Sequence, residues 1–577
     1  MNPFQTIIHI LLYRIGNLLG VLFRHNYIKK AQNGRIVSEK RLMKIIRSSR
    51  NTEYGKKYDF KHIKTISDYQ KMVPLSTYDD YKNYIERTAK EGEQGLICKQ
   101  KIKFLATTSG TTGGIKFIPQ VTAAYFPCFK IICIYLNDIV RSVRLRGKSR
   151  KTMRGLLVTD VNPDTASKNI KGHNKIRTGL ISAYSARGMK FFLPLFTALP
   201  KIVFDTSEIS DMKYVKLRYA LQEPGLKWFG GIYMSSLVDL VNYMLKHSDL
   251  LIHDIETGTI NPTIKMSDHI RTKLERKLRP DRKRAAELRE IFSTHSDIPL
   301  LSRIWKEMSA VIAIGMADFE PFTKKMRTFF SSDVKFGFEA YAASECVIGS
   351  AMHMEDPSYF LLLDSGFFEF LPIESECEEM PKKPLLLNEL ETGKHYEIII
   401  TNRAGLYRYA IHDVVKVSRF EGETPYIEFS YRTTNITDIC GAHITCEHVA
   451  SAVKYIEKAY NINIIDYSLY ANKEHDPPRI ELFFEANPFS STITEKKEQM
   501  ENMFDEALQK TAWDYVFYRN SDSMGKSLLH PVASGTYAHY REILIADGAS
   551  ENQLKAMRVI DSQEKLDYFN KASLSIK

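Results

Sequence analysis

The sequence predicts a large α/β domain followed by a smaller α+β domain. Beyond about residue 100, short apolar runs of strand length alternate with longer amphipathic stretches, which is typical of mixed sheets covered by helices. A polar segment, Arg432–Asp438, then separates this part from a smaller C-terminal unit with its own helices and strands. We therefore expect domains at residues 1–431 and 432–577.

Short apolar runs predict the strands of the larger domain. These runs are Phe104–Thr107, Gly155–Thr159, Leu226–Ile232, Ala310–Ile314, Lys335–Ala340, Tyr359–Leu363, Phe367–Leu371 and Tyr396–Thr401. Two apolar stretches, Ala123–Val140 and Ser235–Leu251, have the length of helices. In the smaller domain the pattern predicts helices at Cys446–Tyr460, at Thr494–Ala512 and after Gln563, and a strand at Ile480–Glu485.

The N-terminus, residues 1–30, predicts an amphipathic helix. Its apolar face holds Ile8, Leu11, Leu12, Ile15, Leu18, Leu19 and Leu22. Because His9, Arg14 and Asn17 interrupt the segment, it makes a poor membrane span, and we expect none. No basic region precedes it and no small-residue cleavage site follows, so a signal peptide is not expected. The pattern favours a helix docked on the protein, with peripheral membrane contact by residues 4–23 as the alternative.

Charge and cysteine content narrow the class of protein. The chain has 81 Lys and Arg against 68 Asp and Glu, a net charge of +13, with basic runs at Arg141–Arg154 and Ile270–Glu290. Neither run has interleaved aromatic residues for base stacking, so we expect solvated helix faces and no nucleic-acid partner.

The seven cysteines form no C-x-x-C pair, which predicts reduced thiols in a cytoplasmic protein. No H-E-x-x-H or G-x-S-x-G motif is present, so neither a zinc site nor a serine-hydrolase elbow is expected.

A loop rich in hydroxyl groups and glycine is the sharpest local signal. Thr107–Gly114 reads Thr-Thr-Ser-Gly-Thr-Thr-Gly-Gly, follows a predicted strand and precedes Lys116. Backbone N–H and hydroxyl groups in such a loop can surround an oxyanion, because glycine allows close backbone approach. It is not a Walker loop. A flexible Ser/Thr/Gly turn is the alternative.

Two further motifs follow predicted strands. Tyr341–Glu345 (Tyr-Ala-Ala-Ser-Glu) offers a ring for a base and a carboxylate for Mg²⁺ beside phosphates, although an ordinary surface glutamate is the simpler interpretation. Gly405–Val415 contains Arg408 and Asp413. An aspartate in this setting can accept hydrogen bonds from the ribose hydroxyls. The arginine can bind a phosphate or form a salt bridge with the aspartate. A structural salt bridge is the alternative for that pair.

Together and in this order, the three motifs resemble the adenylate-forming superfamily of luciferase and the acyl-CoA synthetases. The similarity is greatest to the auxin-responsive (Gretchen Hagen) family of acyl acid amido synthetases. Val73–Asp80, Phe367–Pro372, Gly535–Tyr537 and Gly548–Lys555 extend the resemblance over roughly residues 35–560. It implies a large adenylating N-terminal domain, a mobile C-terminal domain and a hinge at Arg432–Asp438.

The resemblance also implies roles for individual residues. Glu345 would bind Mg²⁺, and Lys555 would reach the α-phosphate or the carboxylate during adenylation. The nucleotide would be bound by Thr108, Ser109, Gly110, Thr111, Thr112, Tyr341, Ser344, Arg408 and Asp413. The sequence departs from the family pattern at three places. The loop before Lys116 is one residue shorter, and His412 stands where the family usually has glycine. In the hinge, Asn435 stands where many adenylate-forming relatives carry an acidic residue.

The implied activity is a ligase that uses ATP and Mg²⁺. It would adenylate an acyl acid and pass the acyl group to an amino acid, with release of AMP and pyrophosphate. Phe126, Phe129, Ile132 and Tyr135 are candidate pocket residues for the acid, and plain core packing is their alternative. We expect a monomer. The rival interpretations are an acyl-CoA ligase and an inactive nucleotide-binding relative that works through protein or membrane contacts.

Overall fold

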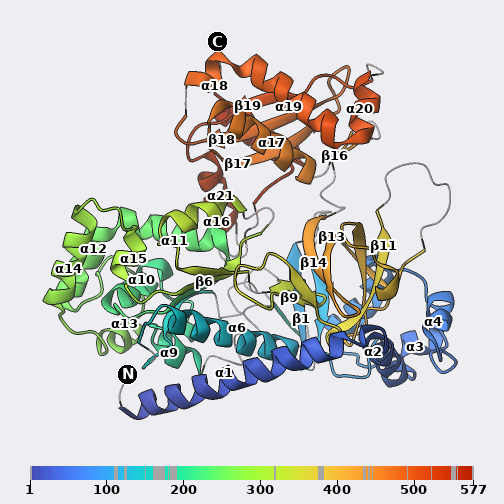
Figure 1. The fold of residues 1–577 in the computed structure, drawn as a ribbon, viewed down its shortest axis with the longest axis horizontal. Helices are drawn as coiled ribbons and strands as arrows, with labels where there is room; N and C mark the ends of the chain where they lie inside the picture. Colours follow the sequence, from blue (N-terminus) through green and yellow to red (C-terminus); the bar gives the residue numbers. More distant parts are fainter. Residues whose placement is uncertain are drawn as a thin grey trace. The chain divides into compact units, whose positions relative to one another are not determined.

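The expected α/β class is confirmed in a computed structural model (Figure 1). It describes residues 3–109, 115–122, 126–149, 151–159, 176–179, 181, 191–316, 320–338, 340–373, 383–432, 437–439, 442–444, 446–489, 491–520, 523–547, 554 and 556–574. The chain divides into two compact units. The first contains Met1–Ile411 and Val415–Phe429, and the second His412–Val414 and Ser430–Lys577.

A four-stranded parallel sheet forms one part of the first unit. Its order is β3 (Gly155–Val158), β5 (Trp228–Tyr233), β6 (Ala310–Ile314) and β7 (Lys335–Gly337). Strands β3, β5 and β6 are continuous runs without charged residues, as expected for strands of a parallel sheet on which helices pack. The helices of this part are α9 (Leu193–Phe196), α10 (Met212–Gln222), α11 (Met234–Lys246), α12 (Ser248–Thr257), α13 (Asp268–Glu275), α14 (Arg282–Ser293), α15 (Leu300–Ile304) and α16 (Glu320–Thr328), with the 3-10 turn η2 (Lys201–Phe204).

A seven-stranded sheet forms the other large part of this unit. Its order is β11 (Gly366–Pro372), β12 (His395–Asn402), β13 (Tyr409–Glu421), β14 (Thr424–Arg432), β10 (Tyr359–Leu361), β9 (Val347–Ser350) and β8 (Ala340–Ala342). A third sheet has the order β2 (Ile115–Gln120), β1 (Phe104–Ser109) and β4 (Arg177–Gly179). The remaining elements here are α2 (Gly34–Ser49), α3 (Glu53–Lys57), α4 (Ile66–Met72), α5 (Tyr78–Glu91) and η4 (Leu387–Glu389).

Two sequence predictions in this unit were wrong in detail. The expected strand Lys335–Ala340 is two strands in different sheets, because β7 pairs with β6 while β8 pairs with β9. The expected helix Ser235–Leu251 is interrupted at His247, which separates α11 from α12.

The second unit has its own apolar core around a three-stranded sheet. Strands β17 (Ile464–Asn472) and β18 (Arg479–Ala486) are antiparallel, and β19 (Leu528–Pro531) is parallel to β18. Helix α17 (Cys446–Tyr460) packs against α19 (Lys497–Thr511). Its other elements are β15 (Thr437–Ile439), β16 (Ala442–Ile444), α18 (Ser491–Glu495), α20 (Trp513–Asn520), α21 (Thr536–Ala546) and α22 (Gln563–Ala572).

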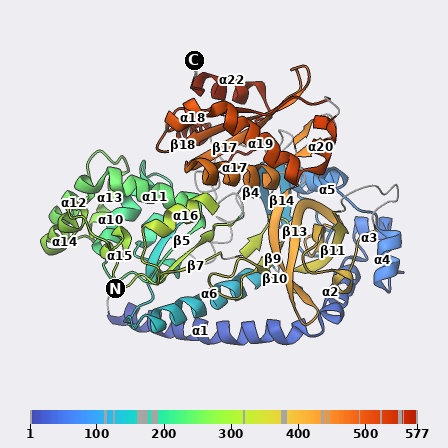
Figure 2. The same ribbon diagram turned by 45° about the horizontal axis from the view of Figure 1, so that its top comes forward.

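The N-terminal helix α1 (Pro3–Ala31) packs along α6 (Phe126–Leu145) in both views (Figures 1 and 2). It docks through small and polar residues. The Nε2 atom of fully buried His9 accepts a 2.8 Å hydrogen bond from the Met153 N–H. At Gly20 a Cβ atom would lie 2.1 Å from the Cys133 carbonyl oxygen, so only glycine allows this approach. Arg24 donates to Asn137 at 2.7 Å and to Asp138 at 2.6 Å.

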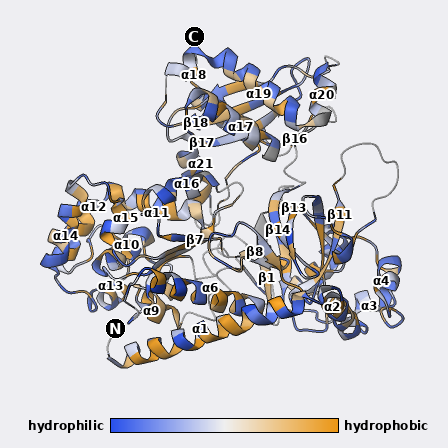
Figure 3. Ribbon diagram, in the orientation of Figure 1, coloured by the Kyte–Doolittle hydropathy of each residue, from blue (hydrophilic) through white to orange (hydrophobic). Residues whose placement is uncertain are grey.

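Helix α1 therefore presents large apolar residues outward. Most of the helix is coloured orange, hydrophobic, in Figure 3. An amphipathic helix of a soluble protein usually buries that side. By length and composition, α1 is also long and apolar enough to cross a membrane. The candidate pocket residues Phe126 and Phe129 lie on this outer side, 57% and 46% exposed. The prediction that Phe126 and Phe129 line an internal acyl pocket was therefore wrong, and Ile132 is also 36% exposed. Of the four candidates only Tyr135 is buried, on the side of α6 next to Gly337 of β7.

Candidate functional site

The hydroxyl-rich segment lies between two paired strands. Strands β1 and β2 are antiparallel, with Thr108 opposite Lys116 and Ser109 opposite Ile115. Gly110, Thr111 and Thr112 lie outside the described residues, as do the side chains of Thr108 and Ser109. The next strand is held by α5, because the Tyr78 hydroxyl accepts a 3.0 Å hydrogen bond from the Phe117 N–H. The Lys116 ammonium lies 5.6 Å from the centre of the Tyr78 ring. Lys116, which follows the shortened loop, therefore has an aromatic partner in this structure.

The Tyr-x-x-Ser-Glu motif forms the turn between β8 and β9. The Ala343 N–H donates to the Cys346 carbonyl at 2.9 Å, and the Cys346 N–H donates back at 3.3 Å, so Ser344 and Glu345 occupy the tip of the turn. The Tyr341 ring is 9% exposed and lies 5.9 Å from the Tyr359 ring, centre to centre.

Two side-chain amides hold this turn by its backbone. Gln120 of β2 donates a 2.7 Å hydrogen bond from Nε2 to the Ser344 carbonyl. Asn402, at the end of β12, donates a 2.7 Å hydrogen bond from Nδ2 to the Glu345 carbonyl. Both amides are buried, at 5% and 3% exposed. Buried amides of this kind fix the backbone to which they bind, because breaking the hydrogen bond leaves polar groups unsatisfied.

The Asn402 side chain also shapes the third motif. Its Oδ1 atom accepts hydrogen bonds from the N–H groups of Ala404 at 2.9 Å and Leu406 at 3.1 Å. Between them Gly405 has φ +101° and lies so close to Ile97 that an added Cβ atom would meet it at 2.7 Å. Gln120 and Asn402 thus connect the strand after the hydroxyl-rich loop, the Glu345 turn and the Gly405 turn. Sequence reasoning missed both residues. The one available signal was an asparagine beside a glycine turn, which is common in loops.

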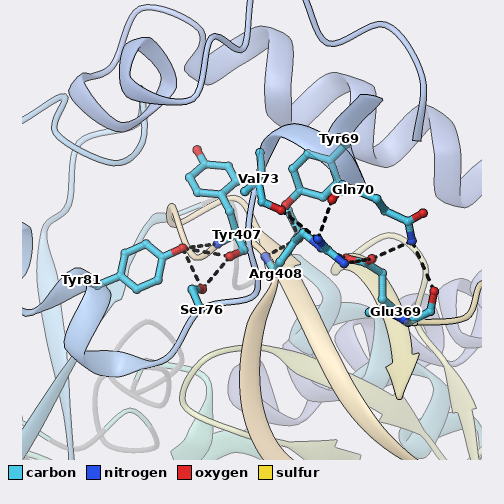
Figure 4. Close-up of polar contacts among 10 residues, drawn as sticks. Tyr69, Gln70, Val73, Ser76, Tyr81, Glu369, Tyr407 and Arg408 are labelled. Atoms are coloured by element: carbon cyan, nitrogen blue, oxygen red, sulfur yellow. Dashed lines mark hydrogen bonds and ion pairs between the residues drawn. The ribbon is translucent and has the colours of Figure 1, made fainter. Parts of the chain in front are cut away.

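Arg408 lies in a buried ion pair. Its Nε and Nη2 atoms donate to the two carboxylate oxygens of Glu369, each at 3.0 Å, and Nη1 donates to the carbonyls of Gln70 at 2.9 Å and Val73 at 2.8 Å (Figure 4). The two side chains are 6% and 1% exposed. Four of the five guanidinium N–H groups are therefore used inside the fold. This contradicts the predicted nucleotide contact of Arg408 and favours the structural salt bridge, with Glu369 rather than Asp413 as partner.

The Val73–Asp80 segment packs on the same turn. The Ser76 hydroxyl donates to the Tyr407 carbonyl at 2.7 Å, and the Tyr81 hydroxyl accepts from the Tyr407 N–H at 2.8 Å (Figure 4). The Ser76 N–H donates a hydrogen bond to the Arg408 carbonyl, and the Ser76 carbonyl accepts one from the Ala410 N–H, each at 2.9 Å. These bonds hold the start of β13, the strand that carries Asp413.

Asp413 is 2% exposed, and its Oδ1 atom accepts a 2.6 Å hydrogen bond from Nε of Arg432. Arg432 is the first residue of the predicted hinge, and residues 433–436, including Asn435, lie outside the described part. The preceding residue, His412, has φ +64°. That is the left-handed conformation that glycine adopts without strain, which explains why glycine is usual at this position in the family pattern.

Lys555 also lies outside the described residues. Close to it in the sequence, the buried Arg558 donates to Asp466 at 2.6 Å and to the Tyr467 carbonyl at 2.9 Å. Among the described residues, no three His, Cys, Asp or Glu side chains form a group that could hold a metal ion. A Mg²⁺ ion bound by one carboxylate and the phosphates of a nucleotide needs no such group, so Glu345 alone fits that requirement.

Comparison with known proteins decides the family. The GH3 family N-terminal domain model matches residues 24–335, the central domain model residues 359–432 and the C-terminal domain model residues 447–564. This chain belongs to the GH3 family. The expected resemblance is therefore confirmed, and α1 up to Phe23 lies before the matched region.

Relatives of the GH3-family chain cover almost its whole length. An indole-3-acetic acid-amido synthetase, GH3.17, of Arabidopsis thaliana is 25% identical over 93% of this chain and 92% of its own. A jasmonoyl–L-amino acid synthetase, JAR4, of Nicotiana attenuata is 23% identical over 91% of each. The solved GH3.15 acyl acid amido synthetase has a TM-score of 0.81 at 20% identity and covers 95% of each chain, so the fold is shared.

Proposed function

We propose that this protein is an ATP-dependent acyl acid–amino acid ligase. The observation that carries the proposal is the match of all three GH3 family models, in order, across residues 24–564. Relatives named as acid–amido synthetases, which align over nine-tenths of both chains, support it. In the first half-reaction a carboxylate oxygen of the acid attacks the α-phosphorus of ATP, and pyrophosphate leaves. In the second, the amine attacks the acyl carbon, loses a proton and displaces AMP.

The residues of this chain would bind and orient the reactants. The Thr108–Thr112 segment would surround the β- and γ-phosphates, and Glu345 would hold Mg²⁺ from a turn that Gln120 and Asn402 keep in place. The ion would neutralise phosphate charge when bound. Asp413 would hold the ribose, and Lys555 would reach the α-phosphate or carboxylate. Positioning of this kind is the main contribution of a protein to transfer at phosphorus.

In the present structure Asp413 is bonded to Arg432. Ribose binding would therefore replace or share that hydrogen bond, and Arg432 begins the proposed hinge. We infer that the second half-reaction follows a movement about residues 432–438 that admits the amine and excludes water. We also propose a cytoplasmic location.

An acyl-CoA ligase is the second candidate, since a 2-hydroxyisobutyryl-CoA ligase in the postadenylation state has a TM-score of 0.50 at 12% identity. The two candidates differ in the acceptor. A panel of carboxylic acids with Mg·ATP, crossed with the common amino acids or coenzyme A, separates them by pyrophosphate release. We expect acid-dependent release that amino acids accelerate and coenzyme A does not.

The matched control in this assay is Asp413→Ala, which should lose acid-dependent pyrophosphate release. Acceleration by coenzyme A alone would contradict the amino acid ligase. Absence of ATP binding by calorimetry would contradict both candidates and favour an inactive relative.

A further inference from the structure

An apolar stripe runs along the outer side of α1. Its members are spaced three or four residues apart, so they share one helix face. They are Phe4 (71% exposed), Ile7 (66%), Leu11 (57%), Ile15 (47%), Leu18 (59%) and Leu22 (52%). From Phe4 to Leu22 this stripe is about 27 Å long at 1.5 Å per residue. Phe126 and Phe129 of α6 extend it, and the Phe23 and Phe129 rings lie 6.2 Å apart, centre to centre.

The stripe cannot be buried by a simple rotation of α1. The opposite side of the helix holds it on the body through His9, Gly20 and Arg24, as described above. Arg24 and Asp138 form a largely buried ion pair, and such a pair is costly to break. The apolar side therefore faces outward because the polar side has specific partners. Exposed patches of this length usually mark a contact surface.

The charged residues of α1 itself are all basic. Of the acidic residues next to it, Asp364 is paired with Lys130, and Glu421 and Glu423 lie just beyond its C-terminal end, at Gln32 and Arg35. No Asp or Glu occurs between residues 3 and 38. Arg14, Lys29, Lys30 and Arg35 are exposed along this stretch, and Arg141 and Arg144 are exposed towards the end of α6. The single acidic residue of α6, Asp138, is buried against Arg24. An anionic lipid surface complements such a face, because basic residues near it add electrostatic attraction to apolar burial.

The same pattern disfavours the other arrangements. A second copy of the chain would bring an identical set of positive charges to the stripe, since a two-fold interface pairs the same patch with itself. A membrane-spanning α1 would carry His9, Arg14, Asn17 and Arg24 into hydrocarbon, where charged and polar side chains are expensive. In an in-plane position the long Arg14 side chain can reach the headgroups instead.

We propose that α1 and the first turn of α6 form a surface that binds in the plane of an anionic lipid bilayer. Leu11, Leu18 and their neighbours insert into the acyl boundary while His9 and Arg24 keep the helix docked on the protein. This surface includes the part of α1 that precedes the matched family region. The inference concerns location and does not rest on the proposed ligase activity.

Vesicle sedimentation with the full-length protein tests the proposal. We expect it to pellet with vesicles of phosphatidylcholine and phosphatidylserine, and to do so less at higher salt or with phosphatidylcholine alone. Leu11→Glu/Leu18→Glu should weaken binding roughly tenfold or more, since two exposed apolar anchors are lost. Leu245→Glu/Ile298→Glu is the matched control, because it changes net charge equally at two other exposed apolar residues, 41% and 55% exposed. It should bind like the unmodified protein.

Each of the following outcomes would overturn the proposal. The full-length protein could stay in the supernatant with both kinds of vesicle. The Leu11→Glu/Leu18→Glu variant, or the milder Leu11→Gln/Leu18→Gln variant if the first does not fold, could pellet like the unmodified protein. Finally, a dimer by light scattering that becomes monomeric in either variant would assign the stripe to a second copy. Release of bound protein by alkaline carbonate supports in-plane binding, and resistance to it would indicate a spanning helix and contradict the proposal.

Discussion

The side-chain amide of Asn402 donates a 2.7 Å hydrogen bond to the backbone carbonyl of Glu345. The other end of the same amide accepts from Ala404 and Leu406, in the turn that precedes Arg408 and β13. One buried side chain therefore fixes the turn of the proposed Mg²⁺ residue relative to the turn that leads to Asp413. Gln120 makes the equivalent bond to the Ser344 carbonyl from the strand that follows the hydroxyl-rich loop.

Replacing Asn402 should impair nucleotide use. Asn402→Asp keeps an acceptor for Ala404 and Leu406 but faces the Glu345 carbonyl with an oxygen in place of the donor. We expect kcat/KM for ATP to fall about tenfold to a hundredfold, as the loss of a buried hydrogen bond would produce. Pyrophosphate release at varied ATP measures the effect. Asn242→Asp, the same change on an exposed residue of α11, is the control. Unchanged kinetics in Asn402→Asp would show that the bond does not position Glu345.

The buried Arg408–Glu369 pair should matter for stability. Glu369→Gln leaves the Arg408 charge buried without its counterion, and such changes cost about 3–5 kcal/mol. Arg87 and Glu53 also form a bidentate pair, through Nη1 and Nη2 at 3.0 Å each, but their side chains are 28% and 48% exposed and Arg87 also binds Glu93. Glu53→Gln should therefore have only a small effect. Urea unfolding of both variants checks this, and equal losses would contradict the role given to burial.

The positive φ of His412 predicts an ordering of substitutions. His412→Gly should keep or slightly raise stability, because glycine adopts φ +64° without steric strain. His412→Val should lower stability by about 1–2 kcal/mol, since β-branched residues are disfavoured there. Ala410→Val, two residues earlier on β13, is the control and should be tolerated better. Equal thermal unfolding of the Gly and Val variants would contradict the backbone conformation described here.

Buried His9 should make the docking of α1 sensitive to acid. Burial, and secondarily the charge of Arg154, lower the pKa of His9 from 6.5 to about 4. Between these values the unfolded chain binds a proton that the folded chain does not, so stability falls as the pH falls from 6.5 towards 4. The shift corresponds to about 3 kcal/mol at most. In His9→Gln, whose amide nitrogen does not titrate, urea unfolding between pH 7 and pH 4 should lose this part of the pH dependence. Parallel curves for the two proteins would contradict it.

Much of the fold follows from local patterns. Ala310–Ile314 and Cys446–Tyr460 have the bounds that the sequence predicts, because continuous apolar runs and helical periodicity are properties of the segment itself. The split of Lys335–Ala340 between two sheets could not be predicted, since it depends on which strands pair with β7 and β8.

The site was predictable as motifs but not as contacts. Arg408 pairs with Glu369, and Asp413 pairs with Arg432. Nothing near Arg408 in the sequence indicates that its ion-pair partner is Glu369. Likewise, periodicity identifies the two faces of α1 but not which of them docks. That choice depends on partners more than a hundred residues away, such as Asp138 for Arg24.

The central claim, acyl-adenylate formation, is tested most directly with an acid whose carboxylate carries oxygen-18. If the carboxylate attacks the α-phosphate and the amine then displaces AMP, one labelled oxygen must leave the acid in AMP. Mass spectrometry of the products should therefore find labelled AMP in the same amount as the amide. Amide formation with unlabelled AMP, or with the label in inorganic phosphate, would contradict the account.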